Sequence, residues 1–296
     1  KTSVVTIISV FLTAIALIGF SYATSFWMLI VLAIPYGLGA GAIDAALNNY
    51  VALHYNSKHM SWLHCFWGVG TIISPFIMSY ALTNTTWHNG YRIVSLLQIS
   101  IAVILLLTIS LWKVNESKNT EQTELKKVKF TDIFKIKGVP YLLIGFFAYC
   151  SAEATAMGWA STYLVEVKNI SDDRAAAFAS LFFIGLTTGR FLGGFIMDKF
   201  GDRKMILFGT AISMFGMLCI LFTDSIEILS LVGFIILGFG YAPIYPCIIH
   251  STPNNFGAEN SGAIIGVQMA SAYLGATFMP PLYGFIGKFI GFSVMP

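Results

Sequence analysis

The stretch Gly194-Phe-Ile-Met-Asp-Lys-Phe-Gly-Asp-Arg-Lys204 forms a short charged connection between two long apolar segments. Residues 174–197 precede it and residues 205–223 follow it, and both segments are rich in Phe, Leu, Ile and Gly. A helix needs about 20 residues to cross the hydrocarbon core of a bilayer. Two such segments joined by a short charged turn are typical of transmembrane helices that meet at the membrane surface.

The same alternation continues in both directions along the chain. Apolar residues make up 56% of the 296 residues and charged residues only 10%, whereas a soluble domain carries about 25% charged residues. Together with a mean hydropathy of +0.76, this excludes a soluble globular domain, a disordered chain and a disulfide-stapled secreted domain. We predict an all-α integral membrane protein with nine transmembrane helices, near residues 4–22, 26–53, 60–83, 91–112, 139–164, 174–197, 205–223, 227–250 and 260–286.

One connection is long and charged. Residues 113–138 carry seven lysines and four acidic residues, which predicts a solvated linker between a first helical half, 1–112, and a second half, 139–296. If residue 1 is cytoplasmic, the inner segments hold twelve lysines and arginines and the outer segments hold four. The positive-inside rule therefore places Lys1 and the linker in the cytoplasm.

An internal repeat relates the two halves. Similar features recur about 200 positions apart in the same orientation, as in Lys1 and Lys204, Gly37-Leu-Gly39 and Gly238-Phe-Gly240, and Gly70 with Pro75 and Gly275 with Pro280. Two parallel halves are a recurrent transporter architecture, in which the substrate site lies between the repeats near the middle of the membrane. The repeat implies two further helices before Lys1 and one after Pro296, which would complete two parallel six-helix halves from an incomplete set of nine.

The charged connection also resembles the loop signature of the major facilitator superfamily. The pattern GxxxD[RK]xGx[RK][RK] is matched at each fixed position, by Gly194, Asp198, Lys199, Gly201, Arg203 and Lys204. The resemblance covers the whole chain as the third to eleventh helices of a twelve-helix transporter. It implies that these residues form a gate that locks one half against the other in an outward-open state, and we expect Arg190 to join Asp198 in the same charge relay.

A second resemblance is narrower. The stretch from Gly37 to Asn48, followed by Trp62-Leu-His-Cys-Phe-Trp-Gly68, is similar to the fucose-permease-like branch of that superfamily. This branch couples sugar uptake to protons and carries an acidic residue four positions before an asparagine in its fourth helix. Asp44 and Asn48 stand at these two places.

Asp44 is the strongest candidate for a functional group. Gly37, Gly41, Asp44 and Asn48 are spaced at helical intervals and share one stripe. An acidic residue at the centre of a transmembrane helix costs at least about 2.5 kcal/mol, so such residues usually face a cavity or a protein partner. We predict that Asp44 carries a proton and that Asp44 and Asn48 contact the solute, although a structural hydrogen bond between helices would also explain the pair.

Glu153 is the equivalent candidate in the second half. It shares a helical face with Tyr149, and Trp159 lies on a neighbouring face where a sugar ring could stack. We predict that Glu153 assists proton coupling and that Tyr149, Glu153 and Trp159 contact the solute, although packing would explain the aromatic residues equally well.

Other candidates for solute binding lie in the third, eighth and ninth predicted spans. His64 and Trp67 belong to an aromatic cluster, and a histidine can relay protons near neutral pH. Tyr245 and Gln268 could line the same cavity. His250, at the cytoplasmic end of the eighth span, is more simply explained as a structural residue.

These features predict a secondary active transporter that moves a small polar solute, with a sugar as the first expectation, by alternating access coupled to protons. Two alternatives stay open: proton-antiport efflux of an amphipathic compound, and a membrane sensor that does not transport. We find no nucleophile paired with a base, no metal-ligand spacing and no nucleotide-binding loop, so we expect no enzyme activity, metal or cofactor. The expected partners are the bilayer, the solute and a proton, without nucleic acid, for a monomer in the cytoplasmic membrane.

Overall fold

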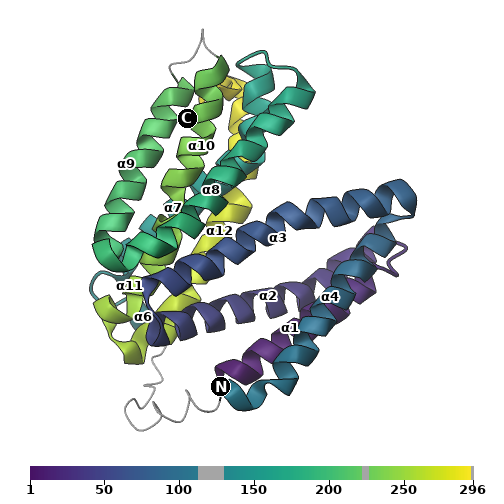
Figure 1. The fold of residues 1–296 in the computed structure, drawn as a ribbon, viewed down its shortest axis with the longest axis vertical. Coiled ribbons are helices and arrows are strands. Elements are labelled where there is room, and N and C mark those ends of the chain that lie inside the picture. The colour runs from purple at the N-terminus through teal and green to yellow at the C-terminus, as the bar shows by residue number, and fades with distance from the viewer. Residues whose placement is uncertain (113–129, 222–226, 295–296) are drawn as a thin grey trace.

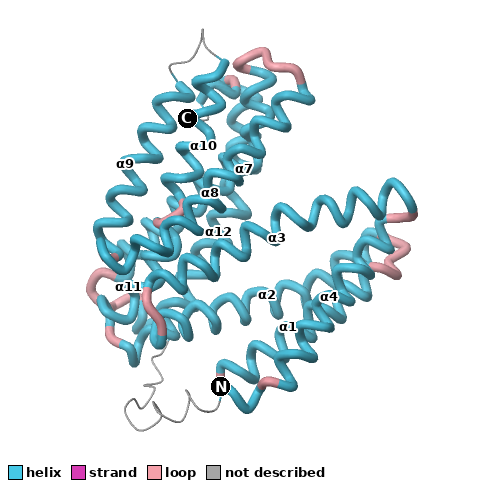
Figure 2. The backbone as a smooth tube through the Cα atoms, viewed as in Figure 1, coloured by secondary structure: helices cyan, strands magenta, loops and turns pink. Residues whose placement is uncertain are grey.

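The computed structural model describes residues 1–112, 130–221 and 227–294, and within these ranges the protein is helical without strands. Short loops join most of the helices (Figure 2). The helices are α1 (Thr2–Phe20), α2 (Phe26–His54), α3 (Ser57–Asn84), α4 (Trp87–Leu107), α6 (Phe130–Ile133), α7 (Val139–Glu166), α8 (Asp172–Phe200), α9 (Asp202–Leu221), α10 (Glu227–Tyr241), α11 (Ile244–Phe256) and α12 (Ala258–Ile290), followed by a 3-10 turn, η1 (Phe292–Val294).

The helices form two groups, which we call the first half (α1–α4) and the second half (α7–α12) (Figure 1). In the first half α1 packs against α2 and α4, and in the second half α7 packs against α12 and α10 packs against α8 and α9. The halves meet where α3 lies against α8 and where α2 lies against α11 and α12. From this junction near α11 the ribbons of the two halves diverge (Figure 1). The proposed linker, 113–138, lies mostly outside the described residues.

The prediction of nine spans is confirmed by length and apolarity within the described ranges. One span differs from the prediction: the segment 227–250 is bent into α10 and α11, and the second part continues to Phe256. The break falls at Ala242 and Pro243, because a proline cannot donate the backbone hydrogen bond that would continue the helix. A second difference is the short helix α6, which lies inside the stretch predicted to be a solvated linker.

The outer surface of the bundle is apolar. Side chains such as Trp27, Leu107 and Tyr141 are more than 70% exposed, which would be costly in water but suits contact with lipid. Inside the second half, glycines let helices approach closely: a Cβ at Gly185 or Gly238 would collide with the backbone of the facing helix in the α8–α10 pair. Close packing against α10 therefore holds α8 in the position from which it presents its polar side chains.

Candidate functional site

Asp44 lies on α2, on the helical face that it shares with Gly37, Gly41 and Asn48. It stands between the open part of this face and its buried part. Nothing among the described residues lies within 4 Å of the position that a Cβ would take at Gly37 or Gly41, whereas Asn48, one turn further, is 1% exposed. Both carboxylate oxygens of Asp44 accept hydrogen bonds. The Asn48 amide donates to Oδ1 at 2.8 Å, and the Tyr273 hydroxyl donates to Oδ2 at 2.6 Å. Since Tyr273 belongs to α12, one of these two bonds joins the halves.

His64 continues this network on α3. Its Nε2 lies 3.0 Å from the amide oxygen of Asn48, which can only accept, so Nε2 carries the hydrogen. The edge of the ring meets Tyr245 of α11, with ring centroids 4.6 Å apart. The Tyr245 hydroxyl lies 3.3 Å from the sulfur of Met269 on α12. Four helices, α2, α3, α11 and α12, thus converge around the Asn48 and His64 pair.

Arg190 and Glu153 form a buried ion pair beside His64. The Arg190 Nη2 lies 3.2 Å from Glu153 Oε1, and the two side chains are 3% and 10% exposed. The Nη1 of Arg190 donates to the backbone carbonyl of His64 at 3.4 Å, and the guanidinium lies 5.2 Å from the centre of the Trp67 ring. Its Nε has no hydrogen-bond partner among the described residues. The Arg190 guanidinium therefore joins the pair to the backbone of His64, and Glu153 is connected to it through Arg190.

These contacts form one continuous polar chain, which we call the central network: Asp44, Asn48, His64, Arg190, Glu153 and Tyr273. Tyr149 lies beside it, with its hydroxyl donating to the Tyr241 carbonyl at 3.0 Å and its ring near that of Tyr245. Two predicted solute contacts are engaged elsewhere. The Trp159 indole donates to the Pro280 carbonyl and stacks on Phe292, whereas Gln268 accepts from Thr252. Any role of Trp159 or Gln268 in binding remains a prediction.

The loop signature lies at the junction of the two halves. Asp198 Oδ1 accepts a hydrogen bond from the backbone N–H of Lys58 at 3.2 Å, and Asp202 Oδ1 accepts one from the Ser57 hydroxyl at 2.7 Å. His250 of α11 adds a third link between the halves, because its Nε2 lies 3.0 Å from the Tyr55 carbonyl while its Nδ1 lies 2.7 Å from Asp202 Oδ2. We call this group the inner contact: Tyr55, Ser57, Lys58, Asp198, Asp202 and His250.

The glycines of the signature have distinct roles at this junction. Gly201 has φ +78° and ψ 155°, a conformation that an L side chain rarely adopts, and it ends α8 just before α9 begins. Gly194 lies under the Trp62 indole, where a Cβ would collide with the ring. Glycine at the first position thus allows the Trp62 indole nitrogen to approach α8, where it donates to the Phe191 carbonyl at 3.3 Å, and glycine at the second allows the turn.

The charged members of the signature are arranged differently from the expected relay. Lys199, Arg203 and Lys204 are exposed at the surface, whereas Arg190 pairs with Glu153 in the central network. The distance along α8 explains the separation, because eight residues between Arg190 and Asp198 correspond to about 12 Å of helix. The gating role of these residues remains a prediction.

Three residues of these contacts escape the sequence analysis. Tyr273 is one of 13 tyrosines, and no spacing connects it with Asp44, 229 positions away. Ser57 and Asp202 likewise come from different halves, and Asp202 occupies a variable position of the loop signature. For Ser57 and Asp202 the sequence offered only a weak signal, which was their place between predicted spans, and for Tyr273, in the middle of the span 260–286, it offered none.

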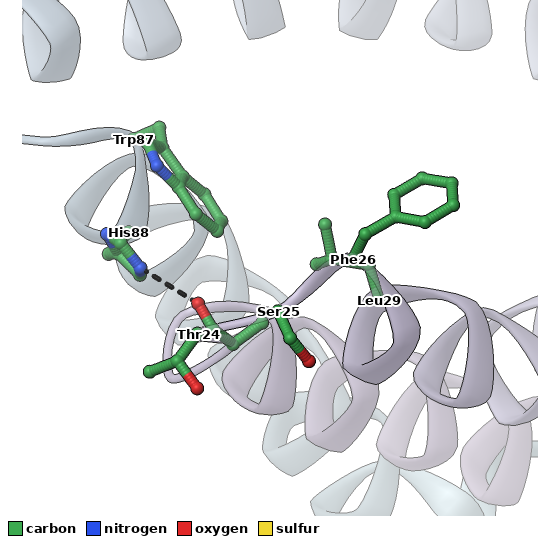
Figure 3. Close-up of a pocket in the computed structure, with 7 residues that line it drawn as sticks. Thr24, Ser25, Phe26, Leu29, Trp87 and His88 are labelled. Atoms are coloured by element: carbon green, nitrogen blue, oxygen red, sulfur yellow. Dashed lines mark hydrogen bonds between the residues drawn. The ribbon is translucent and has the colours of Figure 1, made fainter.

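A separate hollow lies away from both groups (Figure 3). The residues lining it come from the loop between α1 and α2, the start of α2 and the start of α4, where His88 Nε2 lies 3.1 Å from the Ala23 carbonyl. None of the predicted site residues lines it. Among the described residues no cluster of histidine, cysteine, aspartate and glutamate could hold a metal ion.

Comparison with known proteins agrees with this architecture. Residues 2–280 match the model of the Major Facilitator Superfamily. An uncharacterised transporter of this type from Yersinia pestis is 24% identical, over 88% of this chain and 65% of its own length. The cis,cis-muconate transport protein of Acinetobacter baylyi is 25% identical (98% and 74%) and the glucose/mannose transporter of Bacillus subtilis is 22% identical (78% and 59%). The chain thus spans less than two thirds of the Yersinia relative.

Solved structures share the fold. The transporter FucP in its outward conformation has a TM-score of 0.79 at 17% identity, covering 100% of this chain and 79% of its own. A human organic anion transporter has the same TM-score at 12% identity, covering 100% and 74%. Two helical halves, a polar network where they meet and a family match over nearly the whole length lead to one conclusion: the chain belongs to the Major Facilitator Superfamily.

Proposed function

We propose that the protein is a secondary active transporter that moves a sugar or a similar small polar solute across the cytoplasmic membrane together with a proton. It would act as a monomer, by alternating access, with residue 1 and the 113–138 linker in the cytoplasm. The observation that carries the proposal is the carboxylate of Asp44, which accepts hydrogen bonds from both halves at once.

Asp44 is proposed to carry the proton. The ionised carboxylate can accept from Asn48 and Tyr273 together, but a protonated carboxyl must direct its own hydrogen toward an acceptor. Binding a proton therefore changes the link to Tyr273, which is the link between α2 and α12. Protonation of Asp44 and separation of the halves are thereby coupled through one hydrogen bond.

The solute is proposed to bind next to Asp44. Asn48, His64 and Glu153 would offer hydrogen-bonding groups to sugar hydroxyls, and Trp67, which is 47% exposed beside Arg190, would offer a ring for stacking. Sugars as the class of solute are supported by two similar proteins. One relative is a glucose/mannose transporter, and one solved structure of the same fold is a fucose:proton symporter from E. coli. Tyr149 and Tyr245 would complete the wall.

Efflux of an amphipathic compound in exchange for protons is the second candidate. The rings of Trp67, Tyr149 and Tyr245 around the central network favour it, because flat aromatic surfaces bind amphipathic molecules without specific hydrogen bonds. A sensor that binds solute without moving it is distinguished by the absence of flux.

Entrance counterflow in proteoliposomes tests the proposal. Labelled sugars and cis,cis-muconate are offered to vesicles that contain the intact protein, its Asp44→Asn variant, or Asp132→Asn, a control at the exposed Asp132–Lys135 pair. We expect a sugar to exchange in all three, whereas Asp44→Asn alone fails to accumulate it against a gradient. If exchange and accumulation fall together in Asp44→Asn, Asp44 is not a dedicated proton carrier. If no sugar exchanges, the sugar assignment is wrong.

A further inference from the structure

His250 lies between acceptor groups of both halves at the inner contact. Its Nδ1 is 2.7 Å from Asp202 Oδ2, and its Nε2 is 3.0 Å from the backbone carbonyl of Tyr55, the residue that ends α2. The side chain is 13% exposed, so water can reach it. This places an ionisable ring at the end of the molecule that the charge distribution predicts to be cytoplasmic.

The two partners of the ring determine which form fits the contact. A carboxylate and a backbone carbonyl can only accept hydrogen bonds, and a neutral imidazole has only one N–H. The Ser57 hydroxyl, 3.0 Å from Nδ1, is already close to Asp202 Oδ1 at 2.7 Å and so has an acceptor of its own. Only the doubly protonated ring can donate to Asp202 and Tyr55 simultaneously.

The bond from His250 to Tyr55 crosses between the halves, because α11 belongs to the second half and α2 to the first. The Ser57–Asp202 and Lys58–Asp198 bonds cross the same boundary. If the His250 ring loses a proton, one of its two nitrogens faces an acceptor and has no hydrogen to donate. The contact between the halves is then weaker.

We propose that His250 is a proton-binding site of the inner contact, and that protonation of its ring holds the two halves together at this end. The closed contact supplies both acceptors, whereas opening removes the Tyr55 carbonyl and leaves only Asp202, which belongs to the same half as His250, so acid favours closure and alkali favours opening. The site is distinct from Asp44, and the inference does not depend on which solute the protein moves.

Neighbouring charged groups agree with a cation at this position. Asp202 of α9 and Asp198 of α8 bring negative charge from the second half, while Lys58 of α3 contributes its backbone N–H to Asp198. The Cys247 thiol, one turn earlier on α11, also interacts with Asp202. With two carboxylates on one side of the boundary, the protonated ring adds a compensating positive charge at the contact.

Distance measurement by pulsed electron resonance tests this inference in the intact protein in nanodiscs. Spin labels are placed at Val4→Cys on α1 and Leu207→Cys on α9, which are exposed and belong to different halves, while the four native cysteines are buried. The measurement runs from about pH 5.5 to about pH 8.5, on both sides of the usual titration range of histidine. We expect the ratio of closed to open molecules to fall about tenfold with rising pH, the size of effect of one charge-assisted hydrogen bond.

Three variants separate the ring from its surroundings. His250→Gln cannot titrate and should remove the pH dependence. His54→Gln is the matched control, because His54 lies at the same end of the first half and, among the described residues, hydrogen-bonds to Tyr50 of its own helix, and it should keep the dependence. Ser57→Ala should shift the ratio toward open molecules at every pH, and the ratio should still fall with rising pH as in the wild type. A wild-type ratio independent of pH, or an unchanged pH step in His250→Gln, would overturn the proposal.

Discussion

Breaking the Arg190–Glu153 ion pair from one side should destabilise the protein strongly. The change is Glu153→Gln, which keeps the shape of the side chain and removes its charge. Arg190 is 3% exposed and its Nε has no partner among the described residues, so the variant leaves a buried positive charge without a counterion. Removing one partner of a buried pair typically costs about 3–5 kcal/mol.

The expected magnitude lies at the lower end of that range. The 3.2 Å separation is long for a charge-assisted bond, and the Trp67 ring and the His64 carbonyl still interact with the guanidinium in the variant. We therefore expect a loss of about 3 kcal/mol. At about 2 °C per kcal/mol for a chain of this size, thermal unfolding in detergent, followed by size-exclusion chromatography after heating, should shift down by about 6 °C.

The exposed pair Lys135–Asp132 provides the control, since its side chains are 75% and 45% exposed. Asp132→Asn should change the unfolding temperature by no more than about 2 °C, because exposed pairs contribute under about 1 kcal/mol. The double variant Glu153→Gln with Arg190→Met removes the orphaned charge and should recover most of the lost stability. The reasoning is refuted if Glu153→Gln unfolds at the same temperature as Asp132→Asn, or if the double variant is less stable than the single one.

Three further outcomes are expected. Tyr273→Phe should lower proton-driven accumulation severalfold and leave counterflow nearly intact, since it removes only the hydroxyl that links Asp44 to α12; equal losses in both assays would count against it. Gly201→Ala should lower the free energy of unfolding by about 1–3 kcal/mol, because the positive φ of Gly201 strains an alanine. An unchanged unfolding temperature would contradict this argument. Gly238→Ala should cost about 1–3 kcal/mol by overlap with the α8 backbone, whereas Gly145→Ala, with open space around it, should not destabilise.

Contacts within one helix are the part of the site that the sequence could predict. Asp44 and Asn48 are four residues apart on α2, so helical periodicity alone places the amide beside the carboxylate, and the 2.8 Å bond agrees with it. The partners from other helices could not be predicted in this way. Arg190 and Glu153 are 37 positions apart, and their pairing depends on how α7 and α8 rotate against each other, which periodicity does not specify.

Prolines show the same limit for the fold. Pro35, Pro75 and Pro253 lie inside continuous helices, yet the segment with Pro243 divides into α10 and α11. A proline removes one backbone donor in every case. Whether the helix bends or breaks depends on the neighbouring helices that can stabilise the freed carbonyl, and those neighbours become known only from the packed structure.

The central network and the inner contact are carried by the same helices, which constrains how the halves can move. α3 begins with Ser57 at the inner contact and carries His64 seven residues later, while α8 carries Arg190 and reaches the inner contact at Asp198. Each interval is about two helical turns, about 10–12 Å, and nothing within it interrupts either helix. A rigid helix cannot shift at one end of so short an interval without shifting at the other. A parallel shift of α3 away from α8 therefore breaks both groups of contacts, whereas a tilt about the His64–Arg190 contact breaks the inner contact first and strains the central one. In either case a proton or solute bound at one group changes the free energy of opening at the other.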